Sequence, residues 1–126
     1  MTTSAKIFLA AGGFAALAAV ALGAFGAHAL KARLPADALA VWHTAVEYHV
    51  YHALGLLVIG LVAQHLPESL LLKWSGGLML SGIALFSGSL YALALTGERW
   101  LGAVAPVGGS AFLLAWALLA AAVIRS

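Results

Sequence analysis

The chain has 126 residues, of which 64% are hydrophobic and only 8% charged, and its mean hydropathy is +1.07. A soluble domain carries about 25% charged residues, so this composition excludes an ordinary water-soluble protein. The six Lys and Arg residues stand singly and form no basic face of the kind that binds nucleic acid. Because there are no cysteines, disulfides, thiolate metal ligands and iron–sulfur clusters are excluded as well.

Charged residues divide the chain into four apolar blocks. Each block reaches the ~20 residues that a helix needs to cross a hydrocarbon core of ~30 Å. Backbone polar groups in lipid must be satisfied within the segment, which favours helices. We therefore predict an all-α integral membrane bundle of four antiparallel transmembrane helices in one domain, residues 1–126. The helices are expected at about 6–30, 36–65, 70–96 and 101–124.

The first block also resembles a signal peptide, because Lys6 precedes it and Ala27-His28-Ala29 has the form of a cleavage site. Its apolar run is longer than the usual 7–15 residues, so we predict a first membrane helix. Four spans place both termini on one side. Lys and Arg residues divide three against three between the two sides, so the positive-inside rule gives no orientation. The free amino terminus favours cytoplasmic termini.

Small residues follow the first and third predicted helices. Ala15, Ala19 and Gly23 recur at four-residue spacing, which lets helix backbones approach closely in lipid. We expect these stripes to pack inside the bundle, with a homo-oligomer seam as the alternative. The predicted packing residues are Ala15, Ala19, Gly23, Gly26, Gly82, Gly88 and Gly109.

Polar side chains gather near the start of the second predicted helix. Residues four apart are neighbours on a helix, so His43, Glu47 and Tyr51 share one face. Tyr48 and His52 share the adjacent face, and His49 points away from His43 and Glu47. Ionisable groups inside a membrane normally face the bundle interior or water and have partners.

Span order places further polar residues at the same depth, in the half of the membrane nearest the 31–37 connection. We therefore predict a polar pocket between the helices in that half. Its candidate residues are His28, Tyr48, His52, Ser87, Ser89, Tyr91 and Pro106, with His43, Glu47 and His49 as secondary candidates.

Several of these residues have a structural alternative. His28 and His43 suit the membrane interface, Glu47 suits a structural ion pair, and the tyrosines suit an aromatic belt. Ser87 and Ser89 can bond to their own helix, and Pro106 can serve as a kink.

Metal binding would use His43 and Glu47 with His28 as a third ligand, but the chain has no H-E-x-x-H motif, and no metal or other cofactor is predicted. A proton or ion path through an oligomer is a further alternative.

Four blocks of the sequence resemble one known family. They run over residues 23–28, 44–54, 86–91 and 106–109, and they look like the small bacterial membrane proteins of the domain-of-unknown-function 423 family, related to transmembrane protein 256. The resemblance implies a four-helix membrane protein of the bacterial inner membrane and supplies no activity. It points to Gly26, His28, Tyr48, His52, Ser87, Ser89, Tyr91, Pro106 and Gly109. Other members often carry different polar residues at the positions of Glu47 and His49.

The sequence thus favours a non-enzymatic membrane protein. Its expected partners are membrane lipids, a lipid-like or small amphipathic ligand in the polar pocket, and a second copy or another membrane subunit. A metal- or cofactor-binding membrane enzyme, or an oligomeric proton or ion pathway, is the alternative function.

Overall fold

The computed structural model describes all 126 residues. The first span consists of α1 (Thr3–Phe25) and the π-helical turn η1 (Gly26–Leu30), and the second is α2 (Ala36–Ala63). The third span joins α3 (Leu70–Gly82), the π-helical turn η2 (Ile83–Ser87) and α4 (Gly88–Thr96). The fourth is α5 (Leu101–Ile124). All four spans are long and apolar enough to cross a membrane, which confirms the predicted all-α bundle.

Local chemistry sets the helix ends close to the predicted positions. α1 begins at Thr3, earlier than expected, because the Thr2 hydroxyl accepts a hydrogen bond from the Ala5 amide at 3.2 Å. α2 ends at Ala63, before the residues that Pro67 bars from helical geometry. α4 ends at Thr96 because the next residue, Gly97, has a φ of 73° and forms the left-handed cap that favours glycine.

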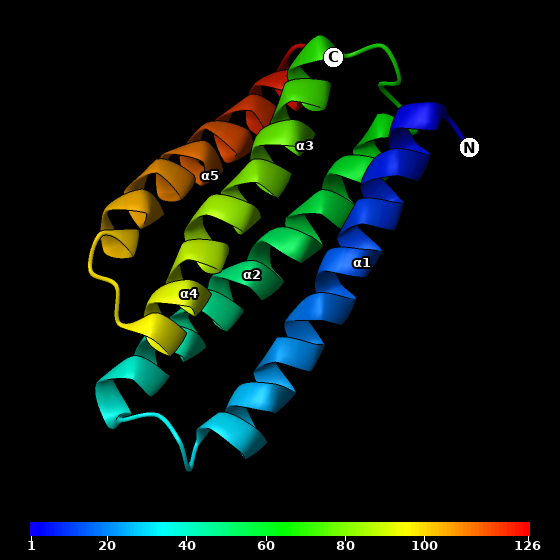
Figure 1. The fold of residues 1–126 in the computed structure, drawn as a ribbon. Coiled ribbons are helices and arrows are strands. Elements are labelled where there is room, and N and C mark those ends of the chain that lie inside the picture. Colours follow the sequence, from blue (N-terminus) through cyan, green and yellow to red (C-terminus); the bar gives the residue numbers. More distant parts are fainter.

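The helices run up and down, and both termini lie at the same end of the bundle (Figure 1). α2 is central and packs against α1, α3, η2 and α4, whereas α5 packs against α3, η2 and α4. The helix α1 contacts α2 almost alone, and it lies at one edge of the bundle in Figure 1. The large apolar core, which includes Leu56, Met79 and Phe112, fills the half nearest the termini.

Close contact between α1 and α2 depends on glycine. A side chain on Gly12 would lie 2.8 Å from Leu57 Cδ2, and one on Gly60 would lie 2.6 Å from Leu9 Cγ. These distances are shorter than any real contact between carbon atoms, so the two helices fit only because both positions lack a Cβ. Neither glycine was among the predicted packing residues, because four-residue spacing along one helix does not identify the small positions of its partner.

The predicted packing residues divide into two groups. Ala19 is buried, Ala15 and Gly23 are half-buried, and all three lie on α1. Side chains on Gly26 and Gly82 would collide with Trp42 and Phe112. By contrast, a side chain on Gly88 would meet nothing within 4 Å, and one on Gly109 would only touch Phe86 at 3.9 Å. The close approaches are therefore concentrated between α1 and α2 and between α3 and α5.

Candidate functional site

One cluster of hydrogen-bonded side chains connects α1, α2 and α4 in the half of the bundle nearest the 31–35 connection. Nδ1 of His49 lies 2.8 Å from the Tyr91 hydroxyl, which joins α2 to α4. Trp42 packs against Tyr91 with ring centroids 4.7 Å apart and ring planes tilted by 54°, and it donates from Nε1 to the Leu22 carbonyl at 2.9 Å. These contacts link three helices through hydrogen bonds.

Trp42 is the residue of this cluster that the sequence analysis missed. It is 2% exposed, and Gly26 opposite it leaves room for its ring, since a Cβ there would lie 2.5 Å from Trp42 Cδ1. A tryptophan near the start of a membrane helix ordinarily indicates the interfacial belt. Pairing it with Gly26, one of the residues that the family resemblance singled out, could have indicated a buried ring.

His52 lies one turn further along α2 and packs against α5. Its ring lies parallel to Phe112 of α5, with centroids 3.4 Å apart and an interplanar angle of 9°. Its Nδ1 donates to the Tyr48 carbonyl at 2.6 Å. A carbonyl oxygen only accepts, so the neutral imidazole carries its proton on Nδ1 and keeps a lone pair on Nε2. His52 is therefore buried and partnered as predicted, but its partners are Phe112 and its own helix.

The buried serines act as links between helices. Ser87 in η2 donates to the Ala45 carbonyl of α2 at 2.7 Å, and Ser75 in α3 donates to the Ala115 carbonyl of α5 at 2.6 Å. Ser89 donates within its own segment, to the Phe86 carbonyl at 2.9 Å. Every buried side-chain nitrogen and oxygen in the structure has a hydrogen-bond partner. Ser75 and Ser87 therefore link different helices, whereas the hydrogen bond of Ser89 stays within the third span.

Other predicted site residues lie on the surface. His28 in η1 and Pro106 in α5 are exposed, as are His43 and Glu47 of α2. Tyr48 is 39% exposed, and its ring packs against Phe86. The structure thus joins His49 with Tyr91 and Ser87 with α2, but it does not bring His28 or Pro106 to His52. No group of three or more His, Asp and Glu side chains is placed to hold a metal ion.

Both π-helical turns overlap sequence blocks that carry the family resemblance. η1 contains Gly26 and His28, and η2 contains Phe86 and Ser87. A π turn widens the helix by one residue and changes which side chains face inward beyond it, and such turns are frequent at functional sites. In η2 the turn places Ser87 against α2. Apolar periodicity gave no sign of either turn.

Cavities lie at the ends of the bundle. One of 440 Å³ lies beside the 31–35 connection and is lined by residues such as Pro35, Asp37 and Thr96. Two others, of 330 and 660 Å³, flank the connection between α2 and α3 at the end that holds the termini. None is lined by His28, His52 or Tyr91.

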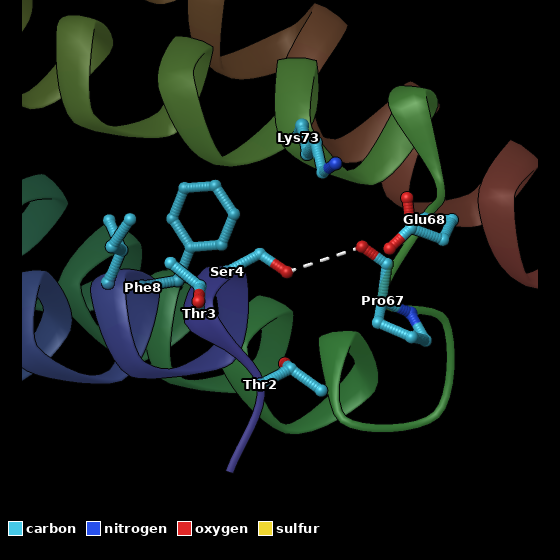
Figure 2. A pocket seen from close by; sticks show the side chains of 8 residues that line it. Thr2, Thr3, Ser4, Phe8, Pro67, Glu68 and Lys73 are labelled. Carbon is cyan, nitrogen blue, oxygen red and sulfur yellow. Dashed lines mark hydrogen bonds between the residues drawn. The ribbon is translucent and has the colours of Figure 1, made fainter.

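The 330 Å³ cavity, here called the terminal cavity, has the fewest hydrophobic residues in its wall. Figure 2 shows the start of α1 on one side, Pro67 and Glu68 on another, and Lys73 of α3 above. The single hydrogen bond drawn among these residues runs from the Ser4 hydroxyl to the Pro67 carbonyl, at 3.4 Å. The lining residues are Thr2, Thr3, Ser4, Ile7, Phe8, Pro67, Glu68 and Lys73.

These features define a small four-span integral membrane protein whose interior polar groups tie its helices together. The family model described as "Protein of unknown function (DUF423)" matches residues 22–109, so the chain belongs to this family.

Its relatives include the UPF0382 membrane protein YwdK of Bacillus subtilis, 48% identical over 95% of this chain and 98% of the relative. A UPF0382 membrane protein of Staphylococcus epidermidis is 45% identical over 95% and 97% of the two chains. One of Staphylococcus saprophyticus is 46% identical over 90% and 93%. No solved structure matches the chain significantly. The names of these relatives state a membrane location and no activity.

The hydrogen bond between His49 and Tyr91 can be tested by removing one partner. We expect Tyr91→Phe to lower the free energy of unfolding by about 1 kcal/mol, since membrane interhelical hydrogen bonds contribute about 0.6–2 kcal/mol. A double-mutant cycle with His49→Leu, measured by equilibrium unfolding in mixed detergent micelles, gives the coupling energy. Strictly additive effects of the two substitutions would show that the contact contributes nothing to stability.

Proposed function

We propose that the protein is a non-enzymatic lipid-binding protein of the bacterial inner membrane, and that the terminal cavity holds the zwitterionic headgroup of an aminophospholipid. One observation carries the proposal. The cavity is lined by one ammonium group, on Lys73, and one carboxylate, on Glu68, and Figure 2 shows no bond between them. Both side chains are exposed at the cavity rim and are available to a ligand.

The depth of the cavity suits a headgroup. In the third span, Lys73 and the last helical residue, Thr96, are 23 positions apart, which corresponds to about 35 Å of helix at 1.5 Å per residue. A hydrocarbon core of ~30 Å centred on this stretch leaves about 2 Å beyond it at each end. Lys73 therefore lies at the level of lipid phosphates and not among the acyl chains.

The charges of the wall favour a zwitterion. A purely anionic headgroup would meet repulsion from Glu68, and a purely cationic ligand would meet repulsion from Lys73. A phosphate beside Lys73 and an ammonium beside Glu68 would satisfy both. The hydroxyl groups of Thr3 and Ser4 line the same cavity and can donate further hydrogen bonds to phosphate oxygens.

A primary ammonium fits this wall better than a quaternary one. It donates hydrogen bonds to a carboxylate, whereas choline groups are ordinarily recognised by cages of several aromatic rings. The lining contains a single aromatic side chain, Phe8. Phe8 and Ile7 form an apolar wall on the membrane side of the polar groups, where the glycerol and first acyl carbons of a lipid would lie.

The proposal can be tested by lipid retention. Delipidated protein is titrated with phosphatidylethanolamine, phosphatidylcholine or phosphatidylglycerol of identical acyl chains, and bound lipid is counted by native mass spectrometry. We expect phosphatidylethanolamine to bind about fivefold more tightly than the other two, the magnitude of a partly screened ion pair. Lys73→Gln and Glu68→Gln should each abolish this preference.

Lys6→Gln is the matched control, because Lys6 is an exposed cation near the start of α1 that does not line the cavity. Exchanging the two charges, with Lys73→Glu and Glu68→Lys together, should restore part of the preference. Equal retention of all three lipids, or loss of preference with Lys6→Gln as well, would contradict the proposal. Glycerophosphoethanolamine, which carries the headgroup without acyl chains, distinguishes a lipid ligand from a soluble one. If it binds as tightly as the lipid, the ligand is a soluble aminophosphate.

A further inference from the structure

The exposed face of α2 carries a regular seam that the bundle itself does not use. Its members recur at alternating intervals of three and four residues and are all exposed, with Tyr51 at 49%, Leu54 at 52%, Val58 at 44% and Leu61 at 60%. An average spacing of 3.5 residues is the signature of two helices that supercoil around each other. We call this face the α2 seam, consisting of Thr44, Glu47, Tyr51, Leu54, Val58 and Leu61.

The polar members of the seam lie deep in the membrane. Glu47 stands ten residues after Asp37, about 15 Å along the helix. A hydrocarbon core of ~30 Å centred on the 28-residue helix α2, which is about 42 Å long, leaves about 6 Å at each end and places Glu47 about 10 Å inside the core. The glutamate side chain is too short to reach the headgroups from there. The Tyr51 hydroxyl donates to Glu47 Oε1, which satisfies one of the two carboxyl oxygens.

The remaining carboxyl oxygen has no partner within the chain, and lipid offers none. Polar side chains in this situation drive transmembrane helices together, because a partner helix supplies the missing hydrogen bond. Glu47 is unlike the buried polar groups of the bundle, all of which have their partners. The α2 seam is thus the face of the bundle on which a polar side chain lacks a hydrogen-bond partner.

We propose that the α2 seam is an interface between two copies of this chain, related by a two-fold axis along the membrane normal. Both copies insert in the same direction, so their α2 helices are parallel, and each seam residue meets its own counterpart. Two Glu47 carboxyl groups then meet in one layer. A carboxylic acid both donates and accepts, so the pair forms reciprocal hydrogen bonds.

Residues beside the seam are complementary in the same arrangement. His43 precedes the seam on one flank, and Tyr48 lies on the other. In a parallel pair, flanking residues five positions apart face each other across the interface. An imidazole of one copy therefore meets a tyrosine hydroxyl of the other, twice. Leu54, Val58 and Leu61 extend the contact with apolar layers toward the opposite side of the membrane.

Disulfide trapping tests this interface cleanly, because the chain contains no cysteine. Leu54→Cys and Val58→Cys, oxidised in native membranes with copper phenanthroline, should each give a disulfide-linked dimer. Phe14→Cys on α1 is the matched control. Phe14 is 73% exposed, more than Leu54, and lies 17 residues before Lys31, as Leu54 lies 17 after Asp37. Random collision would therefore link Phe14→Cys at least as efficiently.

A second measurement follows the polar layer. Dimerisation is measured in liposomes of increasing protein-to-lipid ratio, by energy transfer between labelled copies of the protein. Glu47→Leu should weaken this association by about tenfold. Glu47→Gln keeps both hydrogen-bonding functions and should weaken it less. Because Glu47 is exposed, neither change should alter the unfolding of the single chain.

The outcomes separate the possible occupants of the seam. Dimers at Leu54→Cys and Val58→Cys without dimers at Phe14→Cys, together with the Glu47→Leu effect, support the proposal. Equal linkage at all three positions overturns it as collision. Absence of linkage on the seam overturns it as well. Seam thiols that link only to a different membrane protein overturn the two-copy interface and identify another partner subunit. Lipid retention in the terminal cavity is unaffected by any of these results.

Discussion

Gly108→Ala is expected to destabilise the protein by about 3 kcal/mol or more, although it adds a single methyl group. The added carbon would collide with the backbone nitrogen of Phe86 and lie 2.8 Å from its Cα. Both are main-chain atoms of η2, which is held from the other side by the hydrogen bond from Ser87 to Ala45. Because neither helix can yield locally, α5 must move away from η2 and lose its packing.

Gly109→Ala is the matched control for this prediction. The adjacent glycine belongs to the same helix, and a Cβ there would meet its nearest atom at 3.9 Å, an ordinary contact. We expect a change within about 1 kcal/mol, with stabilisation favoured because alanine is the better helix former. Both variants are compared by equilibrium unfolding in dodecyl maltoside with increasing dodecyl sulfate, followed by far-ultraviolet circular dichroism. Equal stabilities for the two variants would show that α5 does not pack against η2 as described.

Trp42→Ala is the second substitution with a large expected effect. The indole contacts Tyr91, hydrogen bonds to Leu22 and fills the space over Gly26, so its removal leaves a cavity among α1, α2 and α4. We expect a loss of about 3 kcal/mol, the low end for a buried aromatic residue. The low end applies because lipid solvates the unfolded apolar side chain nearly as well as the protein interior does.

The exposed Trp74 provides the comparison, since its side chain is 61% exposed and Trp74→Ala should change stability by less than about 0.5 kcal/mol. Trp42→Phe keeps most of the ring and removes the indole N–H, so it should cost about 1 kcal/mol. Hydrogen exchange read by mass spectrometry should show faster exchange in α1 for Trp42→Ala, because α1 is held almost entirely by α2. Unchanged exchange in α1 would mean that Trp42 does not hold it.

The position of His49 shows what helical spacing in the sequence predicts and what it leaves open. Spacing on an ideal helix predicted that His43, Glu47 and Tyr51 share a face and that His49 points elsewhere. The structure confirms this, with the first three exposed and His49 buried. The same spacing could not tell which face would be covered by other helices. The stronger expectation for the interior was His52 with Tyr91, whereas the partner of Tyr91 is His49.

The two π-helical turns explain part of this difference. Each inserts one extra residue per turn, so residues beyond Gly26 and Ile83 are rotated relative to an ideal helix. The inward faces of the first and third spans therefore change along their length. His28 lies within η1 and is exposed.

Length, hydropathy and the positions of the charged residues determined the membrane location, the four spans and their ends to within about three residues. Those properties follow from the cost of placing backbone and charged groups in lipid, which each segment meets by itself. Only the tertiary structure decided which polar groups meet, because that depends on the rotation and contact of helices distant in sequence. It buried Trp42 and His49, left Glu47 exposed and placed Lys73 and Glu68 in the wall of one cavity near the termini.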